Sequence, residues 1–198
     1  MTGEEEPTLE KCEWAKVSPQ MEAYHDQVWG VPIYDDRLLF RKLILDINQA
    51  GLSWQTILKK WEAFDRAFDS FEIDTVAAYD GKKIQQLLGN KEIIRNRRKI
   101  EAAIHNAQIV QQIQKDYGSF SDYLWGFVDH QPVDHQCAKA EAIPATNQLS
   151  DTVAADMKRK GFIFIGSTIV YAFFQAVGIF NDHEVECYRH SELLQHSD

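Results

Sequence analysis

Four side chains near the two ends of the chain could together bind one metal ion. They are two cysteines and two histidines: Cys12, His25, His183 and Cys187. The last two are four residues apart, which on a helix places both side chains on one face. Thiolates and imidazoles suit a closed, tetrahedral Zn²⁺ site of the structural kind, which would join the two ends of the chain. From spacing alone, a buried thiol with scattered histidines fits equally well, and His190 and His196 compete for the fourth position.

A second group combines aromatic rings with a carboxylate: Trp14, Tyr24, Trp29, Asp46 and Trp54. Aromatic residues at such spacings usually belong to a core. Asp46, however, lies among apolar residues of a predicted helix, where an ionised side chain is costly unless it is paired or lines a cavity. With Asn48 and Gln49 beside it, the run favours a pocket for a planar, hydrogen-bonding ligand over a carboxylate satisfied within the core.

The third group is a short turn between two predicted helices, at residues 161–166. Gly161 and Gly166 flank an apolar run, and Ser167 and Thr168 begin the next helix. The first amide groups of that helix would be free to bind a phosphate. The basic triplet at 158–160 would add attraction for a nucleic-acid backbone. Taken alone, an ordinary helix–helix turn is the commoner explanation.

The elements that must position these groups are helical, because apolar residues recur with the 3.6-residue period of an α-helix. Helices are predicted over residues 38–50, 54–68, 97–114, 119–127, 150–160 and 167–177. Ser53 is expected to cap the second of them, after a break at Gly51. Only residues 162–165 resemble a strand, and this segment is too short and too isolated to form a sheet. The predicted fold class is therefore all-α.

Length and composition further limit the class of protein that the sequence can encode. A chain of 198 residues suits one domain, and its three cysteines, Cys137 among them, make a disulfide framework unexpected. No apolar run is long enough for a transmembrane helix, and the acidic N-terminus does not resemble a secretory signal. These features predict a cytoplasmic protein with no membrane partner.

The formal net charge of −9 argues at first against a nucleic-acid partner. Much of that charge lies in a predicted acidic tail at residues 1–10, however, and basic residues gather at 91–99 and 158–160. Such clusters are more often solvated helix faces than DNA sites. The charge pattern permits DNA as a partner without indicating it.

Taken together, these residues resemble the 3-methyladenine DNA glycosylase I family, within the helix-hairpin-helix DNA glycosylase superfamily. The matching blocks follow the order of the family from Cys12 to Cys187. They are Lys11-Cys12-Glu13-Trp14, Ala23-Tyr24-His25-Asp26, Trp29-Gly30-Val31-Pro32, Gln49-Ala50-Gly51-Leu52-Ser53-Trp54, the basic run from Ile93 to Ile100, the run from Trp125 to Pro132, the hairpin from Lys160 to Gly166, and Asn181-Asp182-His183.

The resemblance implies an all-α helix-hairpin-helix glycosylase fold with a structural Zn²⁺ held by Cys12, His25, His183 and Cys187. It implies that the hairpin binds the DNA backbone, through Lys160, Gly161, Gly166, Ser167 and Thr168. The base pocket would be formed by Tyr24, Trp29, Trp54, Met21 and Asp46. Two positions depart from the family pattern. Asp46 stands where a glutamate is typical, and Met21 stands where family members can have an aromatic residue.

The activity implied is hydrolysis of the N-glycosidic bond of alkylated purines, chiefly 3-methyladenine, after the nucleotide is flipped into the pocket. The partners would be double-stranded DNA with alkylated bases and, as product, free 3-methyladenine. Asp46 is the first catalytic candidate. Asp182 is the second, as a carboxylate that follows the hairpin, unless it only orients His183. No lysine follows the hairpin between 167 and 175, so hydrolysis without strand cleavage is expected.

The predicted organisation is an acidic tail at 1–10, one helical glycosylase domain at 11–188, and a C-terminal tail at 189–198. The domain is compatible with two lobes that hold the base pocket between them, and a monomer is expected. One alternative is a homologue with an altered pocket that binds DNA or a partner without efficient base excision, which Asp46 makes plausible. Another is a zinc-stabilised interaction domain unrelated to DNA, against which the intact hairpin argues.

Overall fold

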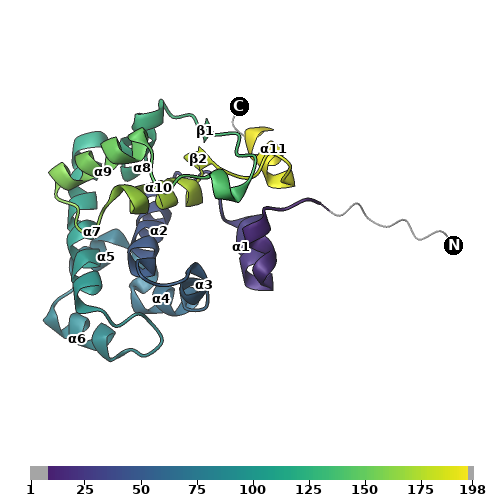
Figure 1. Ribbon diagram of the computed structural model, residues 1–198. Coiled ribbons are helices and arrows are strands. Elements are labelled where there is room, and N and C mark those ends of the chain that lie inside the picture. The colour runs from purple at the N-terminus through teal and green to yellow at the C-terminus, as the bar shows by residue number, and fades with distance from the viewer. Residues whose placement is uncertain (1–8, 196–198) are drawn as a thin grey trace.

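Helices form most of the computed structural model, which describes residues 9–195 (Figure 1). The α-helices are α1 (Pro19–Gln27), α2 (Asp36–Gln49), α3 (Trp54–Leu58), α4 (Trp61–Ala67), α5 (Ile73–Ala77), α6 (Gly81–Gly89), α7 (Arg97–Tyr117), α8 (Phe120–Trp125), α9 (Gln148–Lys160), α10 (Ser167–Ala176) and α11 (Tyr188–Gln195). Short 3-10 helices cover Glu13–Val17, Asp69–Phe71, Gly126–Val128 and Ala140–Ala142. Strands β1 (Val133–Asp134) and β2 (Phe180–Asn181) form a small parallel pair. The predicted all-α class is confirmed.

Polar side chains set where the helices begin. Ser53 accepts a hydrogen bond from the amide of Thr56, which confirms it as the cap of α3. The helix predicted over 54–68 is nevertheless interrupted. Lys60 leaves the helical conformation, at φ −108° and ψ 0°, and separates α3 from α4. The apolar period continues across this break because both short helices pack on the same core, so periodicity alone did not reveal it.

The core lies around α2, which packs against α10, α7 and α8 (Figure 1). Leu39, Phe40, Leu43 and Ile44 of α2 are fully buried. A buried lysine of α7 holds the C-terminal end of this central helix. Lys99 donates hydrogen bonds to the carbonyl oxygens of Asn48 and Ala50, at 2.9 and 2.8 Å. These carbonyls have no partner within their own helix, and a cation also suits the negative end of the helix dipole. This member of the basic run at 91–99 is therefore structural.

The first and the last described segments meet beside α1, where the purple and yellow ribbons of Figure 1 lie together. The amide of Tyr188 donates to the carbonyl of Glu10 at 3.0 Å. The tail predicted over 189–198 is corrected in part, because residues up to 195 belong to α11, in which His190 and Leu193 are buried. Its apolar positions are too few to suggest a helix without their partner surface. His196 and most of the predicted tail at 1–10 lie outside the described residues.

A glycine after α10 brings a distant loop close to the centre of the fold. Gly178 has φ +77°, and a Cβ there would lie 2.5 Å from the backbone nitrogen of Pro32. The amide of Ile33 also donates to the carbonyl of Val177 at 3.0 Å. The loop after α1 is thus held against the end of α10, which places the N-terminal aromatic residues beside α2 and α10. Within residues 9–195, none of the helices has both the length and the apolarity needed to cross a membrane.

Candidate functional site

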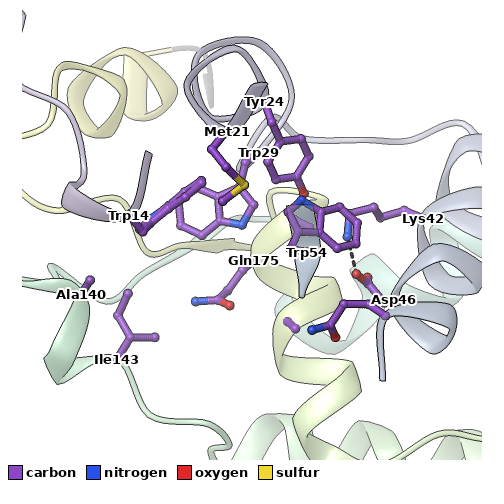
Figure 2. Close-up of a pocket in the computed structure, with 13 residues that line it drawn as sticks. Trp14, Met21, Tyr24, Trp29, Lys42, Asp46, Trp54, Ala140, Ile143 and Gln175 are labelled. Atoms are coloured by element: carbon purple, nitrogen blue, oxygen red, sulfur yellow. Dashed lines mark hydrogen bonds and ion pairs between the residues drawn. The ribbon is translucent and has the colours of Figure 1, made fainter. Parts of the chain in front are cut away.

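A cavity of about 440 Å³ lies between the N-terminal segment and helices α2, α3 and α10 (Figure 2). Its lining is formed by Trp14, Met21, Tyr24, Trp29, Lys42, Asp46, Gln49, Trp54, Ala140, Ile143, Ala172, Gln175 and Ala176. All five residues predicted to bind the base are among them, although they come from separate parts of the sequence. The volume and the mostly apolar lining are typical of a small-molecule site.

Aromatic rings form the walls of this cavity. The rings of Tyr24 and Trp54 lie 5.3 Å apart between centroids, and those of Trp14 and Trp29 lie 4.9 Å apart at a steep angle. In Figure 2 the hydroxyl end of Tyr24 points toward Trp54. Burial, with a smaller contribution from the charge of Asp46, raises the pKa of Tyr24 well above its usual value, so the phenol stays protonated. Such walls suit a flat base, and especially one that carries positive charge.

Asp46 places a carboxylate with spare hydrogen-bonding capacity in the lining. It is buried on α2, and its Oδ1 accepts a hydrogen bond of 2.5 Å from Lys42. Its Oδ2 is buried and has no partner among residues 9–195. Burial raises the pKa of this carboxyl, while Lys42 opposes that shift. A buried acceptor without a partner is costly, and a ligand that donates a hydrogen bond would relieve that cost.

Lys42 is a cavity residue that sequence reasoning missed. Its ammonium pairs with Asp46 and lies 4.1 Å from the centroid of the Trp54 ring. Burial lowers the pKa of this lysine, and Asp46 counteracts part of that shift. The indole Nε1 of Trp54 is itself buried without a partner in the described chain. The spacing of four residues between Lys42 and Asp46 is the signal that could have identified the pair, because it joins side chains on one helix face.

Asp182 lies outside the set of described residues that line the cavity. It is almost fully buried and accepts hydrogen bonds from His135 Nδ1, Tyr171 Oη and Gln175 Nε2, at 2.6, 2.8 and 2.7 Å. Burial alone would raise the pKa of this carboxyl, but these hydrogen bonds hold it below its usual value. Of these three donors, Gln175 lines the cavity. The ring of His183 is oriented by other groups, among them the carbonyl of Trp29 at 3.2 Å.

The four predicted metal ligands come together where the first and the last described segments meet. One donor atom from each of Cys12, His25, His183 and Cys187 lies within 4.8 Å of all the others, and all four residues are buried. The Sγ atom of Cys187 is 3.3 Å from His25 Nε2 and 3.7 Å from His183 Nδ1. The Sγ atom of Cys12 is 3.6 Å from the same Nδ1. The group can therefore hold one metal ion.

The donor set and its surroundings fit Zn²⁺. Tetrahedral Zn²⁺ with bonds of ~2.3 Å to sulfur and ~2.05 Å to nitrogen would separate these donors by about 3.6 Å. Asp26 accepts from His25 Nδ1 at 2.8 Å, which directs Nε2 toward the thiols, as a supporting carboxylate does in zinc sites. Hydrogen bonds from Cys12 and the two imidazoles lower the pKa of Cys187 far below that of a free thiol. The same hydrogen bond between the two cysteines, together with burial, raises the pKa of Cys12. The four side chains by themselves thus favour a thiolate at Cys187, whereas a bound metal would require one at both cysteines.

The predicted turn at 161–166 connects α9 to α10 and is anchored from α7. Asn106 of α7 is fully buried, accepts from the amide of Ile163 at 2.9 Å and donates to its carbonyl at 3.0 Å. Gly161 adopts φ +104° at the end of α9. The N-terminus of α10 at Gly166 has no capping side chain within residues 9–195. Its first amide groups therefore have no partner within the helix.

The side chains predicted to bind DNA around this turn differ in their exposure and in their contacts within the protein. Thr168 is exposed, whereas Ser167 is half-buried and shares a hydrogen bond of 2.7 Å with Ser150. The ammonium of Lys160 lies over the ring of Tyr117, 4.6 Å from its centroid. Ile163 is an exposed apolar residue at the tip of the turn. Backbone amides, more than these side chains, are the free donors at this end of α10.

Comparisons with known proteins agree on one family. A family model described as methyladenine glycosylase matches residues 14–190. The chain is 41% identical to DNA-3-methyladenine glycosylase 1 of Escherichia coli (strain K12), over 90% of this chain and 96% of that protein. A crystal structure of a 3-methyladenine DNA glycosylase I superposes with a TM-score of 0.87 at 42% identity, covering 90% of this chain and 98% of that one. A tyrosine-to-phenylalanine variant of a 3-methyladenine DNA glycosylase I, in complex with 3-methyladenine, also gives 0.87, at 37% identity over 90% and 96% of the two chains.

Proposed function

This chain belongs to the methyladenine glycosylase family and excises 3-methyladenine from DNA, and we propose that the cavity beside Asp46 holds the extruded base. The observation that carries this assignment is the unpartnered Oδ2 of Asp46, a buried acceptor set among indole and phenol rings. A related enzyme has been solved with 3-methyladenine bound. Release of 3-methyladenine from methylated duplex DNA, measured by chromatography, tests the proposal, and its absence at micromolar enzyme would contradict it.

The chemistry of the lesion explains why such a cavity is sufficient. Methylation at N3 makes the adenine cationic and weakens its bond to the sugar, so the base leaves as a neutral molecule. The faces of Tyr24, Trp29 and Trp54 would attract the cationic ring over neutral adenine. Asp46 would accept a hydrogen bond from the base and stabilise the positive charge as it passes to the sugar. Asp46 is one methylene shorter than the glutamate typical of the family, and a bridging water could compensate for the lost reach.

The reaction proposed is hydrolysis without strand cleavage. The bond between the sugar carbon C1′ and the base nitrogen breaks, and its electron pair stays with the base. A water oxygen then bonds to C1′ and loses a proton, which leaves an abasic site. A lyase would need a free amine beside C1′, and residues 167–175 contain no lysine. Among the described residues that line the cavity, Lys42 carries the amine, and this amine is not free because it pairs with Asp46 at 2.5 Å.

We also propose that Cys12, His25, His183 and Cys187 hold a structural Zn²⁺. When bound, the ion would supply a crosslink between the N-terminal segment, through Cys12 and His25 of α1, and the segment before α11. That crosslink would fix the position of Trp14, which precedes α1 and forms part of the cavity wall. No atom of the group belongs to the cavity lining, so its contribution to base excision would be indirect.

The turn between α9 and α10 is proposed to be the hairpin of a helix-hairpin-helix motif that grips the DNA backbone. Free amides at the start of α10 can donate to a phosphate, and the positive end of the helix dipole adds to this. Lys158 and Arg159 at the end of α9 would contribute charge that is not specific for sequence. Double-stranded DNA is thus the partner, while the monomeric state and the cytoplasmic location remain predictions from the sequence.

Replacing Asn106 with alanine is expected to weaken binding to duplex DNA about tenfold, because the turn loses two hydrogen bonds of about 1 kcal/mol each. Fluorescence anisotropy with a duplex that contains an abasic-site analogue measures this change. Gln108→Ala on the same helix is a matched control, since Gln108 binds the distant carbonyl of Ala77. Undiminished DNA affinity in a folded Asn106→Ala protein would contradict the role given to the turn.

Asp182 is proposed to position Gln175 at the cavity and not to touch the base. Asp182→Asn is then expected to lower kcat by about tenfold, and Gln175→Ala by a similar factor. Because both changes would act through one contact, their effects in the double variant should not add. A fully additive cycle, or a loss for Asp182→Asn far greater than that for Gln175→Ala, would favour direct participation of Asp182 in the reaction.

A further inference from the structure

Lys42 places a cation in a cavity that, under the proposed function, receives a cationic base. Its side chain is buried on α2 and lines the cavity. The ammonium lies 2.5 Å from Asp46 Oδ1 and 4.1 Å from the centroid of the Trp54 ring (Figure 2). A carboxylate and an indole face are the two groups that would otherwise attract a cationic ligand. Lys42 therefore already occupies one carboxylate oxygen and one aromatic face that could otherwise bind a cationic ligand.

The pair also changes which hydrogen bonds the cavity offers. An ionised carboxylate alone presents only acceptors, whereas an ammonium carries three donors. One donor of Lys42 is directed to Asp46 Oδ1, and the ring of Trp54 covers another side of the ammonium. Donor capacity thus remains on Lys42, and acceptor capacity remains on Asp46 Oδ2, which has no partner in the described part of the chain. A donor and an acceptor stand side by side, one helical turn apart.

The purines differ in what they present at C6. Adenine carries an amino group there, which donates, whereas guanine carries a carbonyl oxygen, which accepts. A carboxylate by itself matches the amino group and leaves a carbonyl oxygen facing negative charge. An ammonium beside it supplies the missing donor. Sites that leave a buried polar group unpaired discriminate strongly against that ligand, so one added donor can change the range of substrates.

We propose that Lys42 is a specificity-determining residue that donates a hydrogen bond to the C6 carbonyl oxygen of 3-methylguanine, and so raises the release of this base relative to 3-methyladenine. The inference rests on the proposed function of the same cavity. The reaction is unchanged: the bond between C1′ and the base breaks, its electron pair stays with the base, and water adds to C1′ with loss of a proton.

The experiment compares two products of one reaction. DNA treated with a methylating agent contains both 3-methyladenine and 3-methylguanine, and the released bases are separated by chromatography. Both lesions are cationic in DNA, so the charge of Lys42 acts on both and the ratio of their release reports the hydrogen bond. Lys42→Met is expected to lower the ratio of 3-methylguanine to 3-methyladenine about tenfold or more. Lys42→Gln, which keeps an N–H donor, should retain more of the wild-type ratio than Lys42→Met.

Lys83→Met is the matched control. Lys83 makes the same two kinds of contact, with Asp69 at 2.8 Å and with the ring of Tyr79 at 4.8 Å, and it does not line the cavity beside Asp46. This variant should leave the ratio unchanged. An unchanged ratio in a folded Lys42→Met protein, as judged by circular dichroism and the melting temperature, would overturn the inference. Release of neither base by the wild-type enzyme would contradict the proposed function instead.

Free bases provide a readout that does not depend on the folding of any variant. The wild-type protein is titrated with 3-methylguanine and with 3-methyladenine, and the fluorescence of the cavity tryptophans reports binding. Dissociation constants within about tenfold of each other would support a donor that serves the carbonyl oxygen. Binding of 3-methylguanine that is ~100-fold weaker or worse would refute it.

Discussion

Asp46→Asn is expected to lower kcat/KM for release of 3-methyladenine by about 100-fold, which is typical for the loss of one group that stabilises developing charge in a dry site. The change keeps the shape of the side chain and removes its charge. Oδ2 is the acceptor that has no protein partner in the described chain, so its contribution is available to the substrate. Initial rates on methylated duplex DNA, with the enzyme in excess, measure the effect.

Two further substitutions of Asp46 serve as controls for this test. Asp46→Glu introduces the residue typical of the family and should keep activity within about tenfold of wild type. Asp46→Ala should lose activity like Asp46→Asn, and should also unfold more readily. It leaves the buried ammonium of Lys42 without a partner, which costs about 3–5 kcal/mol for such pairs. Equal activity in all these proteins would show that the cavity acid has been assigned wrongly.

Cys187→Ser is expected to abolish binding of one zinc ion per chain and to lower stability by about 4 kcal/mol, the linkage energy of a ligand present at 1,000 times its Kd. For a chain of this size that corresponds to a fall in Tm of roughly 10 °C. The metal content is measured by plasma mass spectrometry, and Tm by calorimetry with and without a chelator. A chelator should lower the Tm of the wild-type protein and leave that of the variant unaltered.

Cys137→Ser is the control for this result. Cys137 is also a buried cysteine, but its Sγ lies 3.7 Å from Asp182 and it is not one of the four clustered ligands. This variant should retain the zinc and respond to the chelator like the wild type. Wild-type protein that contains no zinc after purification in its presence, or whose Tm is insensitive to the chelator, would rule out a structural zinc.

Local sequence patterns predicted the longer elements well. The helices predicted over 38–50, 97–114, 150–160 and 167–177 correspond to α2, α7, α9 and α10, because each carries enough apolar positions for its period to be visible. The short helices α1, α5, α6 and α11 were missed. A helix of two or three turns has few apolar positions, and its stability comes mainly from packing. The interruption at Lys60 escaped notice for the same reason, since α3 and α4 share one buried surface.

What the sequence by itself determined was the choice of chemical groups: two thiols with two imidazoles, aromatic rings with one carboxylate, and a turn flanked by glycines. Their types are local properties, and residue order was enough to suggest a metal centre and a pocket. Only the tertiary structure brought Cys12 within 3.6 Å of His183, across 171 residues of chain. It also enclosed the Lys42–Asp46 pair of α2 in the cavity and placed Asp182 behind Gln175. Such placements depend on which surfaces of distant helices pack together, because the free energy of burial is shared across the whole core and is not encoded at any one position.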